Sequence, residues 1–404
     1  MLSQIAIWKL TLSDGTNNLS ATQVKIKGGE SVLASTTTLT AGTSVVTLAI
    51  PTDVAIDGAL TIEATVGDDT YAYTKAEGAK FNPGTYYQST VSMAKVATDL
   101  SKLTADYTVK NGETLTGKLA GNYKISIADG ATVTLDGVTI TGENSSDYKW
   151  AGITCEGDAT IILKDGSKNT VKGFYEDYPG IQAGPVGKTL IIKGETKGTG
   201  SLDASPYDGG TEHSYGAGIG GGLDISCGDI NIQGGVITVT GGYGAAGIGV
   251  GEGYGEENVS CATITISGGN VTATGGYGAA GIGGGYAYNY GVTCGAITIS
   301  GGTVTAAGGD NAAGIGSGES YSGKTNTCGD ITVTADVTSV TATKGKNATN
   351  SIGAGKDGTC GTITIGGKVY ADGVTISPYT YPEPTIGDVT PLDPFEGGGD
   401  PLAD

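Results

Sequence analysis

Tyrosines recur at fixed positions of a repeat in the second half of the chain. The tripeptide Gly-Ile-Gly recurs with its isoleucine at Ile219, Ile248, Ile282 and Ile315. The sixth residue after three of these isoleucines is Tyr254, Tyr288 and Tyr321, and the fifth residue before two of them is Tyr243 and Tyr277. In register, these side chains would form two short columns on a rigid scaffold, where binding residues are often found.

Columns of exposed tyrosines suit carbohydrate binding, because aromatic rings pack on the apolar faces of sugars while Asn, Glu and Ser bind the hydroxyls. The third member of the shorter column is replaced by Asp310. The longer column falls on loops that vary from repeat to repeat. A plainer alternative stays open, in which tyrosine only covers the corners of the fold and shields a glycine-rich backbone.

Residues for catalysis or metal binding are scarce. The chain has a single histidine, His213, and contains neither arginine nor a Cys-x-x-Cys motif. Asp229 and Asp330 take equivalent repeat positions, but Thr263 and Ala296 separate them, so they do not form the neighbouring carboxylate pair that glycoside hydrolysis requires. We therefore predict no catalytic residue and no metal ligand, and the sequence leans against an enzyme.

One nucleotide-binding motif occurs, at residues 318–325 (GESYSGKT). A Walker A loop binds phosphate only when a strand precedes it and a helix follows. Here the next residues lead into another predicted strand, so we interpret the match as a chance product of a glycine-rich chain. The Gly-x-Gly-x-x-Gly strings, such as residues 216–221, are interpreted as corners for the same reason.

The element that would position the tyrosines is a stack of β coils. Five cysteines lie 32 to 34 residues apart, at Cys227, Cys261, Cys294, Cys328 and Cys360. A period of 20 to 50 residues is typical of a solenoid. Each unit holds about three short β segments separated by glycine corners, so we predict one unit per coil of a right-handed parallel β-helix.

Strand alternation predicts which side chains enter the core of each coil. One isoleucine per coil should point inward, namely Ile230, Ile264, Ile297, Ile331 and Ile363. The residue after each should point outward, namely Asn231, Thr265, Thr298, Thr332 and Thr364. Side chains in register point the same way, which would strain a disulfide, so we expect the cysteines to be stacked free thiols.

Charge limits the partners. The net charge is -19, and no lysine occurs between residues 198 and 323. Such a surface repels nucleic acid and anionic membranes. No apolar run is long enough to span a membrane, which argues against direct membrane insertion. The first residues lack a signal peptide and read directly into a strand, so we expect the chain to start inside a longer precursor.

Residues 1–96 alternate apolar and polar residues between turn signals, which predicts a small antiparallel β-sandwich. Its last strand, residues 81–93, contains Gly84-Thr85-Tyr86-Tyr87. In this segment the chain resembles the second half of the fimbrillin-like domains of Gram-negative gut anaerobes. The resemblance implies an extracellular protein displayed on the outer surface of a Gram-negative bacterium. A generic spacer domain is the alternative.

Residues 97–376 are assigned to the β-helix, whose first coils follow a looser repeat. The stretch VTLDGVTITG, followed by WAGITCEGDATIILKDGSKNTVKG, lies within residues 133–173. Over roughly residues 100–175 the chain resembles bacterial carbohydrate-binding β-helix domains with the architecture of polysaccharide lyases. That resemblance implies a polysaccharide or a host or plant glycan as partner. It also leaves calcium possible, although no cofactor is predicted from the residues themselves.

The last segment, residues 377–404, is acidic and rich in proline, which predicts a disordered tail that could also cover the open end of the helix. The fold class is thus all-β, a parallel β-helix after a small sandwich. The function expected is a non-catalytic carbohydrate-binding protein or adhesin. A polysaccharide-degrading enzyme, lyase or glycoside hydrolase, is the second hypothesis, and a structural surface spacer is the third.

Overall fold

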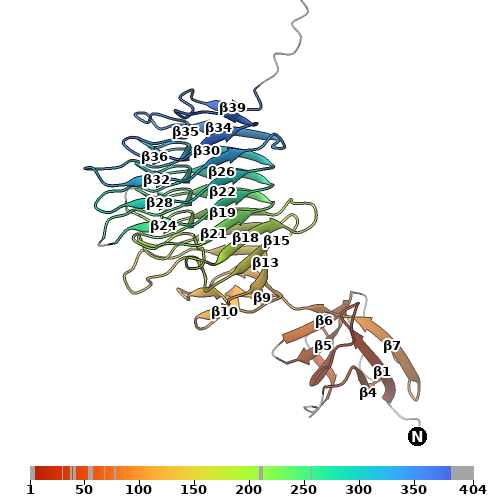
Figure 1. Cartoon of the computed structure of the whole chain (residues 1–404). Helices are drawn as coiled ribbons and strands as arrows, with labels where there is room; N and C mark the ends of the chain where they lie inside the picture. Colours follow the sequence, from red (N-terminus) through yellow and green to blue (C-terminus); the bar gives the residue numbers. More distant parts are fainter. Residues whose placement is uncertain are drawn as a thin grey trace, which may run out of the picture. The chain divides into compact units, whose positions relative to one another are not determined.

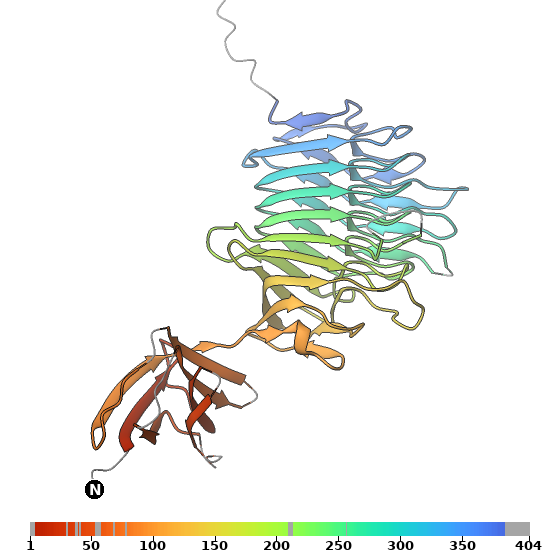
Figure 2. The ribbon, with the colours of Figure 1, turned by 180° about the vertical axis from the view of Figure 1, so that it is seen from behind.

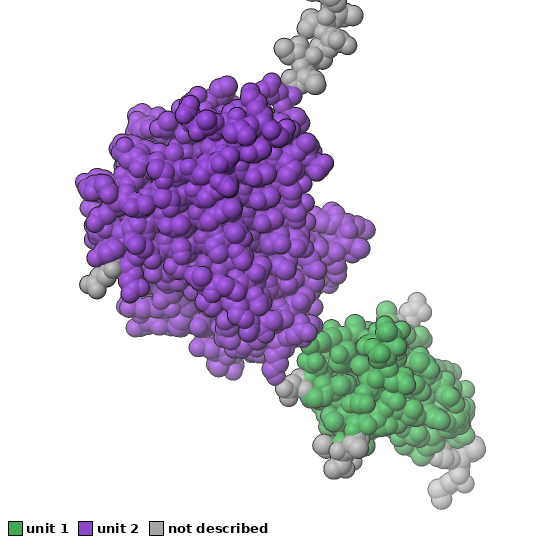
Figure 3. All heavy atoms as spheres, in the orientation of Figure 1, with its two compact units in different colours: residues 1–98 green, residues 99–404 purple. Residues whose placement is uncertain are grey.

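The computed structural model describes residues 5–383 apart from 30, 37–38, 40–41, 53–57, 68, 77–78, 209–212 and 256. Over these residues the chain consists of β-strands and one short 3-10 helix, η1 (Leu100–Lys102). It divides into two compact units, Met1–Thr98 and Asp99–Asp404 (Figure 3). The division falls two residues after the predicted boundary at residue 96. No helix in the described part of the chain has the length and apolarity to cross a membrane.

Unit 1 consists of two sheets around one core. The first has the order β4-β1-β7 and the second the order β3-β2-β5-β6-β8. The strands are β1 (Ile5–Ser13), β2 (Gln23–Gly28), β3 (Ser31–Ser35), β4 (Val45–Pro51), β5 (Leu60–Val66), β6 (Asp69–Lys75), β7 (Tyr86–Ser92) and β8 (Ala94–Lys95). Alternate residues of β1, such as Trp8 and Leu10, are buried against strands of both sheets. The predicted sandwich differs in one respect, because β1 and β7 pair in parallel.

Unit 2 is a parallel β-helix, seen in Figures 1 and 2 as stacked coils coloured from orange to blue. Its most extensive sheet contains two adjoining ladders of strands that pair in parallel through most of the stack. One ladder contains β15 (Ala159–Leu163), β18 (Thr189–Gly194), β21 (Asp229–Ile232), β25 (Ile264–Ile266), β29 (Ile297–Ile299), β33 (Ile331–Val333) and β37 (Ile363–Ile365). The other contains β16 (Lys168–Lys172), β19 (Ser201–Ser205), β22 (Val236–Thr240), β26 (Asn270–Thr274), β30 (Thr303–Ala307) and β34 (Ser339–Thr343).

Two narrower sheets complete the coils. A nine-stranded sheet contains β10 (Tyr107–Val109), β12 (Ile125–Ile127), β14 (Ile153–Cys155), β17 (Ile181–Gln182), β20 (Ile219–Gly220), β23 (Ile248–Gly249), β27 (Ile282–Gly283), β31 (Ile315–Gly316) and β35 (Ile352–Gly353). A four-stranded sheet contains β24 (Val259–Cys261), β28 (Val292–Cys294), β32 (Asn326–Cys328) and β36 (Thr359–Cys360). Strand β32 directly follows the Walker-like segment, so the motif lacks the helix that phosphate binding needs.

The predicted register is confirmed. Ile264 pairs with Ile297, which pairs with Ile331, and each of these side chains is fully buried. The threonines that follow them pair in the same order, as in Thr265 with Thr298, and are partly exposed. One row of branched apolar side chains per coil fills the core of the regular coils, whereas the buried aromatic residues of this core, Phe174 and Tyr379, lie outside them.

The cysteines also lie in register and are free thiols, as predicted. Cys227, Cys261, Cys294 and Cys328 are buried, whereas Cys360 in the last coil is partly exposed. Burial raises the pKa of Cys155, in an earlier coil, to about 12. These thiols therefore act as small apolar core residues in the stack.

The sequence predicts that the Gly-Ile-Gly segments are simple corners. This is wrong, because each of them contains a two-residue strand. A regular coil such as that of β24 to β27 consequently has four short strands instead of about three. Gly249 illustrates the cause, since its φ is +135° and a Cβ there would lie 2.1 Å from the carbonyl oxygen of Gly283. Only glycine tolerates that backbone angle and that approach of the next coil.

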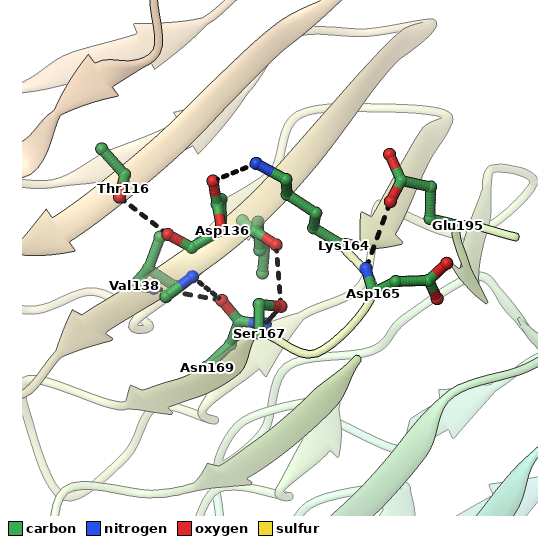
Figure 4. A network of polar contacts seen from close by, with 10 residues as sticks. Thr116, Asp136, Val138, Lys164, Asp165, Ser167, Asn169 and Glu195 are labelled. Carbon is green, nitrogen blue, oxygen red and sulfur yellow. Dashed lines mark hydrogen bonds and ion pairs between the residues drawn. The ribbon is translucent and has the colours of Figure 1, made fainter. Parts of the chain in front are cut away.

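The early coils are less regular and use side chains to hold the backbone. These coils also contain β9 (Thr98–Asp99), β11 (Glu113–Lys118) and β13 (Ala131–Ile140). Asn169 accepts hydrogen bonds from the backbone N–H groups of Gly137 and Val138, both at 3.0 Å (Figure 4). Lys164 forms an ion pair with Asp136 in the same network. Such bonds satisfy buried backbone groups where the repeat departs from its period.

The end of the helix is capped by antiparallel strands. β38 (Lys368–Val369) folds back on β37, and β39 (Tyr379–Tyr381) pairs with β34. The predicted tail therefore does not begin at residue 377, because Tyr379 is buried in the core and continues the sheet. Covering the open end satisfies backbone groups that a further coil would otherwise bind. The rest of the predicted tail lies outside the described residues.

Candidate functional site

The two predicted tyrosine columns are present. The rings of Tyr243 and Tyr277 are stacked, with centroids 5.1 Å apart and an interplanar angle of 6°. In the longer column, Tyr288 stacks on Tyr254 at 5.5 Å and on Tyr321 at 5.1 Å. These distances follow from the coil register, because parallel strands repeat at roughly 4.8 Å.

A third column between them was not predicted. Its members are the fourth residues after each Gly-Ile-Gly-type isoleucine, namely Leu223, Glu252, Tyr286, Glu319 and Lys356. We call this set the position-four column. Its position in the repeat can be read from the sequence. It was not predicted because its residue type differs from coil to coil.

Backbone hydrogen bonds hold the position-four column in place. The N–H of Tyr286 donates to the carbonyl of Gly244 at 2.7 Å, and the N–H of Glu319 donates to that of Gly278 at 2.7 Å. Each bond joins one coil to the loop before the Gly-Ile-Gly segment of the preceding coil. The side chains of Glu252, Tyr286 and Glu319 are consequently buried, with 3 to 5% exposure.

Tyr286 connects the two tyrosine columns. Its ring meets Tyr277 edge-on at 5.8 Å and lies 5.6 Å from Tyr288. A further tyrosine that sequence reasoning missed, Tyr215, meets Tyr243 edge-on at 6.4 Å. The result is one continuous aromatic surface spread over successive coils.

This surface lines a cleft of about 590 Å³. The lining residues are Glu176, Asp177, Tyr215, Leu223, Tyr243, Glu252, Tyr254, Tyr277, Tyr286, Tyr288 and Tyr321. All five tyrosines predicted from the repeat are among them. The lining contains no lysine, and its carboxylates belong to the earlier coils while most tyrosines belong to the later ones. We call the carboxylates Glu176, Asp177 and Glu252, with the tyrosines of the same coils, the acidic half of the cleft, and the tyrosines of the later coils the aromatic half.

The stacking restricts how the tyrosines can meet a ligand. Within a column, each ring covers one face of its neighbour, so flat stacking of a sugar between coils is blocked. Tyr254 and Tyr321 each have one face outside the stack, and they are 52% and 46% exposed. The cleft therefore offers two ring faces at the ends of the longer column, with ring edges and phenol hydroxyls between them.

Comparison with protein families supports the description of unit 2 as a β-helix. Two stretches match the family model of the beta helix repeat. They are residues 264–286 and 297–319. Each begins at an inward isoleucine strand and ends at or beside the position-four column. No curated protein and no solved structure matches the chain.

Glu252 is the most unusual group in the cleft. Its carboxyl oxygen Oε2 is buried and has no hydrogen-bond partner. Burial, together with the nearby charge of Asp224, raises the pKa of Glu252 to about 8. Burial and the charge of Glu176 also raise the pKa of Asp177. Protonation avoids the cost of a buried, unpaired carboxylate, so Glu252 is largely neutral at pH 7.

Glu319, two coils further on, occupies the same repeat position but is fully paired. The Lys356 ammonium lies 2.9 Å from its Oε1, and the Asn311 amide donates to its Oε2 at 2.7 Å. The charge and hydrogen bond of Glu319 raise the pKa of Lys356. Glu252 has Gly244 in the place of Asn311 and Tyr286 in the place of Lys356. It therefore lacks both donors.

The other carboxylates considered in the sequence are structural. Asp229 accepts the N–H of Thr263 at 2.8 Å, and Asp330 accepts the N–H of Thr362 at 2.7 Å. Each thus holds the first residues of the following coil. His213 is exposed and is not part of the cleft lining. In the described part of the chain, no group of three or more His, Cys, Asp and Glu side chains is arranged to hold a metal ion.

Proposed function

We propose that unit 2 binds carbohydrate in the tyrosine-lined cleft without altering it. The observation that carries this proposal is the convergence of seven tyrosines and three carboxylates on one cleft. Exposed faces of Tyr254 and Tyr321 would pack on pyranose rings, and phenol and carboxyl groups would bind hydroxyls. The alternative in which tyrosine merely shields the backbone does not account for a cleft of about 590 Å³.

The resemblances noted in the sequence support a setting for this activity. A fimbrillin-like unit 1 and a carbohydrate-binding β-helix would suit a protein displayed on the outer surface of a Gram-negative bacterium, with a plant or host glycan as partner. Calcium is part of that proposal only through the resemblance. Retention on the glycan with and without a chelator tests it.

The binding test uses a panel of plant and mucin polysaccharides and the complete chain. Replacing Tyr254, Tyr288 and Tyr321 by alanine should abolish retention of the protein on its glycan. Tyr86→Ala is the matched control, because Tyr86 is 58% exposed but lies in unit 1. Unchanged affinity of the triple variant, with intact circular dichroism, would remove the cleft as the binding site. A wild-type chain that no glycan retains would favour the structural spacer.

One observation favours the second candidate, an enzyme that degrades polysaccharide. Glu252 holds a proton at neutral pH and shares the cleft with Asp177, and glycoside hydrolysis uses a protonated carboxyl beside a carboxylate. If the wild-type chain releases new reducing ends or unsaturated products from a polysaccharide and the Glu252→Gln variant does not, the protein is an enzyme and the proposal of binding without alteration is wrong.

A further inference from the structure

The acidic half of the cleft contains a buried carboxyl group whose expected partners are missing. Glu252 is 3% exposed, lines the cleft, and has an oxygen without a hydrogen-bond partner. Protonation removes the charge of this group at neutral pH, but one of its oxygens is still buried without a hydrogen-bond partner, which is costly in a folded protein. A ligand that supplies the missing donors would therefore gain from binding there.

A second glutamate at the same repeat position shows which groups can pair with a carboxylate there. Glu319 stands at the same point of the repeat and binds the ammonium group of Lys356 and the amide of Asn311. Glu252 makes the equivalent backbone bond, in which its N–H donates to the carbonyl of Tyr215, although at 3.4 Å it is longer than the 2.7 Å bond of Glu319. What is absent beside Glu252 is a cation.

The surroundings of Glu252 favour an organic cation over other donors. Tyr215, Tyr243 and Tyr254 line the same cleft, and the faces of aromatic rings attract ammonium groups. The carboxylates of Glu176 and Asp177 add negative potential, and Asp224 lies close enough to act on Glu252. Lys149 is the cation that acts on Asp177, but it is not part of the lining.

We propose that the acidic half of the cleft is a subsite for an ammonium group, so that the bound glycan contains an amino sugar with a free amine. This inference rests on the proposed carbohydrate binding and names its substrate class. The amine of one sugar residue would lie between Glu252 and the tyrosines, and the rest of the chain would follow the aromatic half. Uronic acids, sulfated sugars and sialic acids would be repelled.

Three tetrasaccharides test the proposal by calorimetry on the complete chain: the β-1,4-linked tetramer of glucosamine, its fully N-acetylated counterpart, and cellotetraose. We expect the amine-bearing tetramer to bind roughly ten- to a hundredfold more tightly than the other two, as one charge-assisted hydrogen bond provides. Glu252→Gln, which keeps the shape of the side chain, should remove that preference. Glu319→Gln is the matched control and should keep it.

The outcomes separate the two proposals. If the three tetramers bind equally well, the ammonium subsite is wrong and carbohydrate binding stands. If none binds and no polysaccharide is retained, carbohydrate binding fails. Ethanolamine serves as a primary ammonium without a sugar. If it binds as tightly as the amine-bearing tetramer, and Glu252→Gln abolishes this, the amino-sugar assignment is overturned in favour of a small organic cation.

Discussion

Two buried glutamates at one repeat position have opposite surroundings. Glu319 is closed off by Lys356 and Asn311, and it is not part of the cleft lining. Glu252 has no cation and no amide, and it lines the cleft. The two glutamates occupy the same repeat position, and two of the groups that differ around them are the side chains of residues 244 and 311 and of residues 286 and 356.

That comparison shows how a solenoid can separate scaffold from site. The backbone ladder repeats from coil to coil and is held by isoleucine, cysteine and glycine columns. The outward positions of the same ladder are free to vary. Where the next coil supplies a partner for a buried carboxylate, as Lys356 does for Glu319, the position is structural. Where it supplies none, the position remains available to a ligand.

The largest expected difference between the two glutamates is in the pH dependence of stability. The pKa of Glu252 in the folded chain is about 8, above its unfolded value near 4.5. An acid with a raised folded pKa holds its proton in the folded state, so stability is highest below pH 4.5 and is lost as pH rises toward 8. At about 1.4 kcal/mol per pKa unit, the loss is on the order of 5 kcal/mol.

Urea unfolding at pH 5 and pH 8.5 measures this loss. Asp177, whose pKa is also raised, contributes in the same direction, so the comparison is between wild type and Glu252→Gln. The variant should lose most of the pH dependence and be more stable than wild type at pH 8.5. Glu319→Gln should leave the pH dependence in place. Equal slopes for wild type and Glu252→Gln would show that Glu252 is not buried as described.

The second prediction removes the cation that pairs with Glu319. Lys356→Met removes the ammonium beside Glu319, which is 3% exposed, and so leaves a buried carboxylate with only the Asn311 amide. Because Lys356 is itself half exposed, we expect a loss of unfolding free energy that is smaller than for a fully buried pair.

A double variant provides the control for that experiment. Lys356→Met combined with Glu319→Gln removes the charge that the lysine had neutralised, so most of the lost stability should return. If the single and the double variant are equally unstable, the lysine acts through its packing and the ion pair is not what closes this position.

Much of this arrangement could be predicted from sequence because the repeat fixes registers. The inward isoleucines, the free cysteines and both tyrosine columns needed only the period and strand alternation. Five cleft residues, such as Tyr254 and Tyr277, were found in this way. The acidic half was not, because Glu176 and Asp177 belong to an irregular earlier coil whose place against the later ones depends on three-dimensional stacking.

The burial of the Glu252 side chain could not be predicted from the sequence either. Nothing in the sequence around Glu252 predicts that its side chain is buried. Only the coil-to-coil backbone bonds show that position four is covered by the loop of the preceding coil. For the tail, the proline-rich composition predicted disorder, with a cover over the open end of the helix as the alternative. The strand Tyr379–Tyr381 forms such a cover, because its buried tyrosine packs on the core and its backbone pairs with the last long ladder strand.

The third prediction gives Glu252 a lysine partner like that of Glu319. Tyr286→Lys places an ammonium in the coil after Glu252, as Lys356 lies in the coil after Glu319. The new lysine should occupy the proposed subsite and lower the affinity for the glucosamine tetramer about tenfold, the value of one charge-assisted contact. Tyr286→Met removes the ring without adding a charge, and it should keep the preference for the amine-bearing tetramer. Equal losses in both variants would assign the effect to the ring.

The smallest effect is expected from copying the amide. Gly244 has φ +74° and Asn311 has φ +72°, so asparagine can adopt the backbone angle at residue 244. A Cβ at Gly244 would lie 2.7 Å from Oε2 of Glu252, so the end of that flexible carboxyl group must shift. In Gly244→Asn, a new hydrogen bond to Glu252 should raise stability at pH 8.5 by about 1 kcal/mol and lower the pKa of the carboxyl group.

Gly244→Ala supplies the same Cβ without the amide, and it should destabilise the chain by about 1 kcal/mol because alanine resists a positive φ. The difference between the two variants isolates the hydrogen bond from the strain of the backbone. If asparagine and alanine have equal effects at pH 8.5, the amide does not reach Glu252. In that case the cation alone, and not the pair of donors seen around Glu319, distinguishes the closed position from the open one.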